Sequence, residues 1–313
     1  MSPTIAIGAD IGGSHISSAA IDIVSGKVLK ETSVERKLDN QAPAAEIIAV
    51  WASCVKESLS RVPAHSVKGI GFAMPGPFDY VKGIGHFKGV SKYETLEGLN
   101  VGEALRAELQ ADALGIRFMN DASCFAVGEA RAGKAAAYKK SMSITLGTGL
   151  GSACVEDGIP VVDGPSVPEL GCLGFLPYKK SIADDHFSTR WFIQRYLEET
   201  GTKVAGVKEL TTSRDPAAKA LFDTFGDELA GFISPWLTKF GAEILVIGGN
   251  ISFAWDFFGG AFEARLAKEH CSCRVALSEL KEDAALLGAA YLFDDASWEA
   301  VQHALPLMSQ ATE

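Results

Sequence analysis

Basic residues are few and dispersed in this sequence of 313 residues. Lys and Arg total 29 against 39 Asp and Glu, they form no run, and the formal net charge is −10. A protein that binds nucleic acid needs a basic surface for the phosphates, so we expect no nucleic-acid partner. The acidic excess favours solubility.

Long apolar runs and a cysteine framework are missing as well. No apolar stretch approaches the roughly 20 residues that span a bilayer, and MSPTIAIGAD lacks the basic and apolar regions of a signal peptide. The six cysteines are scattered, which favours reduced thiols over disulfides. Cys271 and Cys273 lie close together, but a Cys-x-Cys pair lacks the spacing of a zinc site. We therefore expect a cytoplasmic protein without membrane contact.

The apolar material that is present suffices for two ordinary domains. Apolar residues make up 47% of the chain and charged residues 22%, as in soluble globular proteins. Helical periodicity predicts helices over 43–59, 102–114, 188–200, 215–240 and 283–305. Alternation and turn residues predict strands within 5–35, 67–79, 115–120, 142–161 and 243–252.

A coarse internal repeat divides the chain. A strand, a glycine loop and a second strand at 5–23 recur at 144–162, and mixed helices and strands follow each of them. We therefore predict two similar α/β domains, 1–120 and 121–283, that face each other across a cleft. One large α/β domain is the alternative.

The second glycine loop lies in ITLGTGLGSACVEDG, residues 144–158. A P-loop requires a Lys after its last glycine, which is missing here, and a dinucleotide-binding loop requires a following helix. Instead an alternating strand follows and closes on Asp157-Gly158. The pattern predicts a β-hairpin whose N–H groups bind phosphate, because Gly147 and Gly149 permit a tight turn and Thr148 adds a hydroxyl.

The first glycine loop carries a carboxylate, because Asp10 precedes Ile-Gly-Gly-Ser. A carboxylate beside phosphates repels them unless a cation lies between. Asp10 is therefore a candidate partner of Mg²⁺, directly or through water. Ordinary glycine turns in two hairpins are the alternative interpretation.

Five motifs, taken in order, resemble those of the ROK family of sugar kinases and are glucokinase-like. They are Asp10–Ser14, Ala73–Pro77, Asn120–Asp121, Leu146–Gly149 and Ile247–Asn250. The resemblance covers nearly the whole chain. It implies the two-domain actin/hexokinase/Hsp70 ATPase fold, an α/β fold with ribonuclease H-like halves and a central cleft. It also implies that a C-terminal helix of about 284–313 packs back on the first domain.

The resemblance further implies a set of site residues. Asp121 would be the catalytic base that accepts the proton of the attacking sugar hydroxyl. Helix capping is the alternative role for this residue. ATP would be bound by Asp10, Gly12, Gly13, Ser14, Gly147, Thr148, Gly149, Gly248, Gly249 and Asn250. Sugar would be bound by Gly76, Asn120, Asp121, Glu169 and Asp184.

The departures from the family pattern fall on the sugar side. Cys172 stands where the family has a His that contacts sugar and binds structural zinc, and FLPYKKSIADDHFS replaces the cysteine-rich zinc loop. Three zinc ligands at a sensible spacing are missing, so we predict no structural zinc. The family's sugar-binding Asn is also missing, and Ser91, Lys92 or Tyr93 are candidates to reach the sugar instead.

The sequence thus predicts an ATP- and Mg²⁺-dependent kinase of a hexose or hexosamine, assembled as a homodimer. The alternative is a sugar-sensing regulator that has lost catalysis. Repressors of the family carry an N-terminal helix-turn-helix, whereas this sequence opens on its first predicted strand. A silent sensor would be expected to lose Asp10 or Asp121, and both are present.

Overall fold

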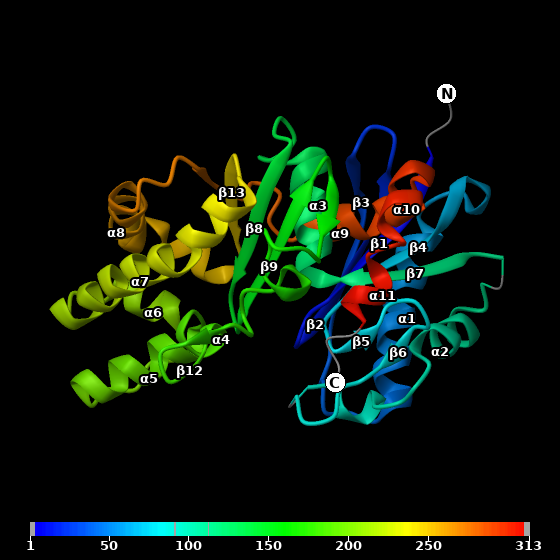
Figure 1. Ribbon diagram of the computed structural model, residues 1–313. Helices are drawn as coiled ribbons and strands as arrows, with labels where there is room; N and C mark the ends of the chain where they lie inside the picture. Colours follow the sequence, from blue (N-terminus) through cyan, green and yellow to red (C-terminus); the bar gives the residue numbers. More distant parts are fainter. Residues whose placement is uncertain (1–3, 91, 112, 310–313) are drawn as a thin grey trace. The chain divides into compact units, whose positions relative to one another are not determined.

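Two compact α/β units make up the chain. The structure, a computed structural model, describes residues 4–90, 92–111 and 113–309 (Figure 1). Within these limits the first unit comprises residues 4–136, 158–160 and 282–309, and the second comprises residues 137–157 and 161–281. The division expected after residue 120 lies after residue 136 instead, because α3 packs against α9 within the first unit.

The first unit contains a five-stranded sheet with the order β3-β2-β1-β4-β7. β1 pairs antiparallel with β2 and parallel with β4, which pairs parallel with β7. β1 is buried along almost its whole length, because α1 and α9 both pack against this sheet. The elements are β1 (Ile5–Ile11), β2 (His15–Asp22), β3 (Lys27–Lys37), α1 (Ala44–Ser60), β4 (Val67–Met74), β5 (Phe78–Asp79), β6 (Ile84–Gly85), α2 (Val101–Leu109), β7 (Gly115–Asn120), α3 (Asp121–Ala132), α9 (Asp283–Ala290), α10 (Asp295–Val301) and α11 (Leu305–Met308).

The main chain of α9 lies directly against the main chain of β1 and β4. A Cβ added to Gly8 of β1 would lie 2.0 Å from the carbonyl oxygen of Leu286, and one added to Gly71 of β4 would lie 1.9 Å from that of Ala289. The same helix meets α3 in this way, because a Cβ on Gly128 would lie 1.9 Å from a carbonyl oxygen of α9. Glycine at these positions allows the close approach.

The single C-terminal helix predicted over 284–313 is wrong. α9 ends at residue 290 and passes through a 3₁₀ turn, Tyr291–Phe293, before α10 and α11. Asp294 interrupts the helix with an extended backbone, and its side chain accepts hydrogen bonds from the N–H of Ser297 at 2.9 Å and from its hydroxyl at 2.8 Å. This N-cap starts a new helix, α10. Residues 310–313 lie outside the described part.

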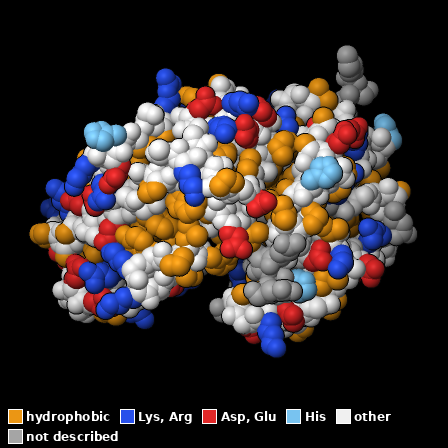
Figure 2. All heavy atoms as spheres, in the orientation of Figure 1, with side chains coloured by type: hydrophobic (Ala, Val, Ile, Leu, Met, Phe, Trp, Pro, Cys, Tyr) orange, Lys and Arg blue, Asp and Glu red, His pale blue; other side chains and the backbone are white. Residues whose placement is uncertain are grey.

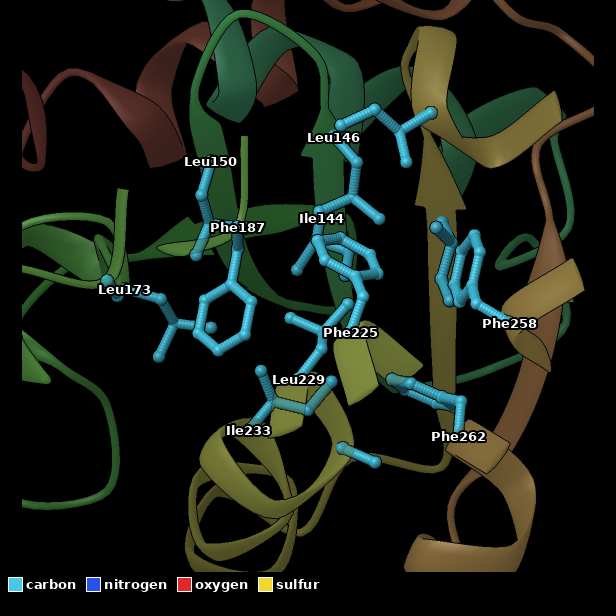
Figure 3. Packing of buried hydrophobic residues seen from close by; sticks show 14 of the residues in the cluster. Ile144, Leu146, Leu150, Leu173, Phe187, Phe225, Leu229, Ile233, Phe258 and Phe262 are labelled. Atoms are coloured by element: carbon cyan, nitrogen blue, oxygen red, sulfur yellow. The ribbon is translucent and has the colours of Figure 1, made fainter. Parts of the chain in front are cut away.

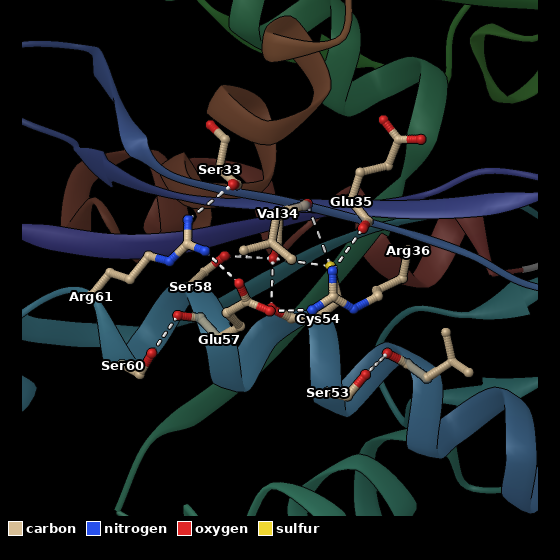
Figure 4. A network of polar contacts seen from close by, with 12 residues as sticks. Ser33, Val34, Glu35, Arg36, Ser53, Cys54, Glu57, Ser58, Ser60 and Arg61 are labelled. Atoms are coloured by element: carbon tan, nitrogen blue, oxygen red, sulfur yellow. Dashed lines mark hydrogen bonds and ion pairs between the residues drawn. The ribbon is translucent and has the colours of Figure 1, made fainter.

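α1 is tied to β3 by a polar network (Figure 4). Glu57 pairs with both Arg36 and Arg61, and Arg61 donates to the carbonyl oxygen of Ser33 at 3.3 Å. Buried Ser58 donates to the main chain of β3 at 2.9 Å. Partly exposed ion pairs contribute little free energy, so the network mainly fixes how the helix lies on the sheet.

The second unit repeats the topology of the first. The sheet has the order β10-β9-β8-β13-β14, with an antiparallel β8–β9 hairpin and parallel pairing of β13 to β8 and β14, and of β10 only Val161 is grouped with the second unit. The internal repeat in the sequence is therefore a repeat of strand order. The elements are β8 (Lys140–Leu146), β9 (Leu150–Glu156), β10 (Ile159–Val161), β11 (Pro177–Tyr178), β12 (Ser181–Ile182), α4 (Ala183–His186), α5 (Thr189–Thr200), α6 (Val207–Thr212), α7 (Pro216–Phe240), β13 (Ile244–Gly248), α8 (Trp255–Lys268) and β14 (Arg274–Leu277).

The core of the second unit joins its sheet to α7 and α8 (Figure 3). Leu146 and Leu150, the residues on either side of the glycine loop, are buried in one cluster with Phe225 of α7 and Phe258 of α8. Burying a side chain of this size contributes about 1.5–3 kcal/mol. The core therefore anchors both ends of the loop.

The surface mixes charges of both signs. On the face drawn in Figure 2, acidic and basic side chains are interspersed. Among the described residues, no helix is both long enough and apolar enough to cross a membrane.

Candidate active site

Polar side chains gather at one edge of the sheet in the first unit. Asp10 lies near the end of β1 and is paired in register with Ala73 of β4, whose next residue, Met74, pairs with Asn120 of β7. Asp121 follows at once as the first residue of α3. Ligands of open α/β sheets bind at the carboxyl ends of the strands. Three of the predicted site residues therefore lie at a suitable edge.

The loop between β1 and β2 presents free N–H groups. The N–H of Gly12 is used within the loop, because it donates to the carbonyl oxygen of His15 at 2.9 Å. The N–H groups of Gly13 and Ser14, both exposed residues, have no acceptor among the described residues. Successive free N–H groups of this kind form an anion-binding site.

Two residues distant in sequence hold this loop by its carbonyl groups. The hydroxyl of Tyr93 donates to the carbonyl oxygen of Gly12, and the side-chain amide of Asn40 donates to that of Gly13. The N–H of Tyr93 donates to the carbonyl oxygen of Asn40 at 3.0 Å, so the two supports are linked. The carbonyl groups of Gly12 and Gly13 are turned toward these donors, and the N–H groups of Gly13 and Ser14 stay free.

Tyr93 therefore supports the loop between β1 and β2, and its hydroxyl is engaged there and not with a sugar as suggested from the sequence. Its ring is fully buried, and burial followed by the charge of Asp10 raises the pKa of its hydroxyl. Of the two other candidates, Lys92 is half-buried and Ser91 lies outside the described residues.

Asn120 caps α3 and thereby leaves Asp121 for another role. The side-chain oxygen of Asn120 accepts from the N–H of Ser123 at 3.1 Å, so the interpretation of Asp121 as the N-cap is wrong. One oxygen of Asp121 accepts from the amide of Asn120 at 3.0 Å and from the N–H of Ala122 at 2.8 Å. These bonds orient the carboxylate, and its second oxygen makes no hydrogen bond to the described residues.

The Pro-Gly loop after β4 lies next to Asn120. A Cβ added to Gly76 would lie 3.4 Å from the hydroxyl of Tyr80. That hydroxyl donates to the carbonyl oxygen of Met74 at 3.1 Å and accepts from the amide of Asn120 at 3.4 Å. The predicted sugar contacts Gly76 and Asn120 are thus brought together through Tyr80.

Asp10 lies in an unfavourable place for a negative charge. Burial, followed by the charges of Asp121 and Glu282, raises the pKa of Asp10 to about 7. A cation beside the carboxylate would offset both effects. Within the described chain, no three His, Cys, Asp or Glu side chains form a metal-binding group. A single carboxylate in this position would suit Mg²⁺, whose other ligands would come from phosphate and water.

Asp10→Asn should change how stability depends on pH. The pKa of Asp10 is raised from 3.8 to about 7 by folding, so the stability that its protonated form provides is lost as pH rises from about 4 to about 7. We therefore compare the free energy of unfolding in denaturant, measured without Mg²⁺. The value for the Asn variant minus that for the wild type should be larger at pH 8 than at pH 5. Glu299→Gln removes an exposed carboxylate of the same unit and should show no such trend. Parallel pH dependences for Asp10→Asn and the wild type would contradict the assignment.

The glycine loop of the second unit also presents free N–H groups. The N–H of Gly147 donates to the carbonyl oxygen of Gly149 at 3.0 Å, while those of Thr148 and Gly149 have no acceptor in the described chain. The carbonyl oxygen of Gly147 accepts from both the N–H and the hydroxyl of Thr189, at 2.8 and 2.9 Å. The prediction that a hairpin strand rather than a helix follows the loop is confirmed.

The end of β13 lies against this loop. Gly248 pairs in register with Thr145 of β8, and a Cβ on Gly249 would lie 2.4 Å from the carbonyl oxygen of Leu146. Gly249 has a φ of 80°, which glycine adopts readily. Gly249 and Asn250 are exposed. The two segments of this unit that are expected to bind ATP, 147–149 and 248–250, are therefore neighbours.

The PELG segment presents an exposed carboxylate. The side chain of Glu169 makes no hydrogen bond or ion pair with the described residues. Ser152 of β9 holds the following turn, since its hydroxyl donates to the carbonyl oxygen of Gly171 at 2.9 Å and accepts from the N–H of Leu173 at 2.7 Å. Cys172 is half-buried between these contacts.

Aromatic packing organises the segment that replaces the zinc loop. Residues 175–188 form β11, β12 and α4. The ring centroid of Tyr178 lies 5.1 Å from that of Phe187 and 5.2 Å from that of Phe232, and the last two are 5.3 Å apart. Such aromatic pairs add about 0.5–1.5 kcal/mol each beyond burial.

Asp184 points at the glycine hairpin. Its carboxylate accepts from the N–H of Leu150 at 2.6 Å and from the guanidinium of Arg190 at 2.7 Å. Each oxygen of the carboxylate thus accepts one hydrogen bond from within the same unit.

The side chains that support the two loops are not indicated by the sequence. Asn40, Thr189 and Arg190 belong to no motif and come from distant parts of the chain. The Ser-Thr pair before the predicted helix at 188–200 is a helix-start signal, but it does not indicate what the helix start contacts. For the others we find no signal in the sequence.

The sequence is similar to those of known sugar kinases. The model of the ROK family matches residues 6–296. The glucokinase of Thermotoga maritima is 26% identical over 92% of this chain and 97% of that protein. The N-acetyl-D-glucosamine kinase of Pectobacterium carotovorum is 25% identical over 78% of this chain and 83% of that protein.

Solved structures match the fold. A ROK family glucokinase from Streptomyces griseus, solved with glucose and AMPPNP, has a TM-score of 0.71 at 20% identity over 92% of this chain and 98% of that chain. A ROK family transcriptional regulator, a homologue of the E. coli MLC protein, has a TM-score of 0.74 at 18% identity, covering 98% of this chain and 80% of that chain. The chain therefore has the two-domain actin-like ATPase fold.

Proposed function

Because the chain belongs to the ROK family, we propose that it is a sugar kinase, which transfers the γ-phosphoryl group of Mg·ATP to a hydroxyl of a hexose or hexosamine. One observation carries the proposal: each unit holds a glycine loop with two free N–H groups at the edge of its sheet. In the first unit the catalytic carboxylate and the proposed magnesium partner belong to the same edge.

The chain's own residues supply what phosphoryl transfer needs, namely positioning and charge stabilisation. Asp121 accepts the proton of the attacking hydroxyl through its second oxygen. The N–H groups of Gly13, Ser14, Thr148 and Gly149 donate to phosphate oxygens and offset the charge that develops on them. Mg²⁺, when bound near Asp10, adds positive charge beside the phosphates.

The sugar contacts that we propose are Gly76, Asn120 and Glu169. Asn120 offers an amide and Glu169 an exposed carboxylate, which suits a ligand whose hydroxyls each need a partner. The proposal spans hexoses and N-acetylhexosamines because relatives named for both kinds of sugar match the chain. The preference between them would be altered by Cys172, which stands in place of the family's His.

A regulator without catalysis is the second candidate, and the likeness to a ROK transcriptional regulator favours it. That role requires neither an oriented Asp121 nor a carboxylate at Asp10, and both are retained. The homodimer and the cytoplasmic location stay predictions of the sequence.

The direct test is release of ADP from Mg·ATP in the presence of single hexoses and N-acetylhexosamines. We expect turnover that depends on one sugar or a few related sugars, with little ADP release when no sugar is present. Binding of Mg·ADP without turnover on any sugar would favour the regulator. Binding of neither nucleotide nor sugar would contradict both functions.

A further inference from the structure

Asp184 makes a direct contact with the phosphate hairpin of the second unit. Its Oδ1 accepts from the N–H of Leu150, the first residue of β9, at 2.6 Å. The N–H of Asp184 donates to the carbonyl oxygen of Gly174 at 2.9 Å, which fixes its main chain. A carboxylate that accepts from a backbone N–H makes a stronger hydrogen bond than a neutral acceptor. This bond holds the hairpin at the residue where the loop ends.

The contact between Asp184 and the hairpin requires glycine at position 149. A Cβ added to Gly149 would lie 2.3 Å from Oδ1 of Asp184, so an alanine there would displace the carboxylate. Glycine at 149 thus leaves the space that the Asp184 carboxylate occupies. The N–H of Gly149 is one of the two free donors of this loop.

Arg190 fixes the other side of the carboxylate. Its guanidinium lies 2.7 Å from Oδ2 of Asp184, and its side chain is 56% exposed. The preceding residue, Thr189, grips the opposite end of the loop through two hydrogen bonds to the carbonyl oxygen of Gly147. The first turn of α5 and Asp184 therefore hold the loop at both ends.

We propose that Asp184 is a positioning residue for ATP, which keeps the N–H groups of Thr148 and Gly149 directed at the phosphates, and that Arg190 holds Asp184 in place. The proposal rests on the proposed function, because it assigns the role of the hairpin in nucleotide binding. It replaces the sugar contact expected for this residue. The aspartate acts through the loop and touches neither substrate.

The test compares binding of Mg·ADP by calorimetry with KM values for Mg·ATP and for the sugar that the wild type accepts. In Asp184→Ala we expect affinity for Mg·ADP to fall and KM for ATP to rise by about tenfold or more, since a hydrogen bond to a charged group is lost. KM for the sugar should stay within about twofold. Asp184→Asn keeps an acceptor for Leu150 and should recover most of the affinity.

Arg190→Ala should raise KM for ATP by about two- to threefold, because an exposed ion pair contributes little and is screened by salt. Arg195→Ala is the matched control: it removes an arginine of the same helix that also pairs with carboxylates, Glu198 and Glu199, and should change neither constant. The double variant Asp184→Ala/Arg190→Ala should resemble Asp184→Ala alone, since Arg190 acts through Asp184.

The outcomes separate this proposal from the proposed function. A wild type that fails to bind Mg·ADP overturns the proposed function and this inference with it. A wild type that phosphorylates sugar, together with an Asp184→Ala variant whose sugar KM rises while its ATP KM stays unchanged, overturns only the inference. A large loss of kcat in Arg190→Ala at saturating ATP would show that Arg190 contacts the phosphoryl group itself, which also contradicts the proposal.

Discussion

Asp121→Asn should lower kcat for sugar phosphorylation by roughly 10²–10⁴-fold, the range that a positioned general base contributes. Asparagine keeps the size of the side chain and can still accept from Asn120 and the N–H of Ala122. It cannot take up the proton of a hydroxyl at neutral pH. Because the charge of Asp121 helps to raise the pKa of Asp10, the variant should also ionise Asp10 more readily. Binding of Mg·ATP should therefore persist.

Asp295→Asn is a control with the same local setting. Asp121 and Asp295 are each the first residue of a helix whose N-cap is the residue before, Asn120 or Asp294. An acidic residue in the first turn stabilises a helix by about 0.3–1 kcal/mol, so each variant should lose this small contribution. Asp295 also pairs with exposed Lys68 at 3.1 Å, which adds little, whereas loss of the Asp121 charge relieves its repulsion of Asp10. Only Asp121→Asn should lose turnover. Equal activity in the two variants would mean that Asp121 is not the base.

Gly8→Ala and Gly71→Ala should each destabilise the protein strongly. The new Cβ atoms would lie 2.0 and 1.9 Å from carbonyl oxygens of α9, so a strand or the helix must shift. Overpacking typically costs 1–3 kcal/mol, and we expect about 3 kcal/mol or more here because main chain, which has no other rotamer, blocks the added atom. Proteins have total free energies of unfolding of about 5–15 kcal/mol, so the expected loss is a large fraction of the total. Unfolding in denaturant measures the change.

Gly260→Ala provides the opposite case. Gly260 lies within α8, and a Cβ added there meets nothing within 4 Å. Helix propensity favours alanine over glycine by up to about 1 kcal/mol, so this variant should be more stable than the wild type. If Gly8→Ala lost less than about 0.5 kcal/mol, within the usual effect of surface changes, the close packing of α9 would be refuted.

Local features of the structure followed from local features of the sequence. The spacing of Gly147 and Gly149 before an alternating segment was enough to predict a hairpin, because the strand period and the turn are both encoded within a few residues. The signal for the Asp294 cap was also present in Asp-Asp-Ala-Ser. The apolar periodicity on either side outweighed it, and one long helix was predicted where the chain forms several.

Features that depend on distant contacts did not follow. The domain division was predicted near residue 120 from the internal repeat, yet Gly128 brings α3 against α9 within the first unit. The supports at Asn40, Tyr93 and Thr189 depend on which main-chain carbonyl groups lie nearby after folding. Asp184 shows the same limit, because a motif predicts that a carboxylate is present and only the folded chain determines what it faces.

The contact of α9 with β1 and β4 has a consequence for the order in which the protein forms. β1 and α3 carry the proposed magnesium partner and the proposed base, but the helix that packs against both is encoded by residues 283–290. A nascent chain that has completed α3 has the strands of this sheet and no main chain to fill the space along Gly8 and Gly71. Contacts between segments so far apart in sequence form slowly. The first unit therefore cannot mature during synthesis in the usual N-terminal-first order, and its two carboxylates reach their final spacing only after the second unit has been made.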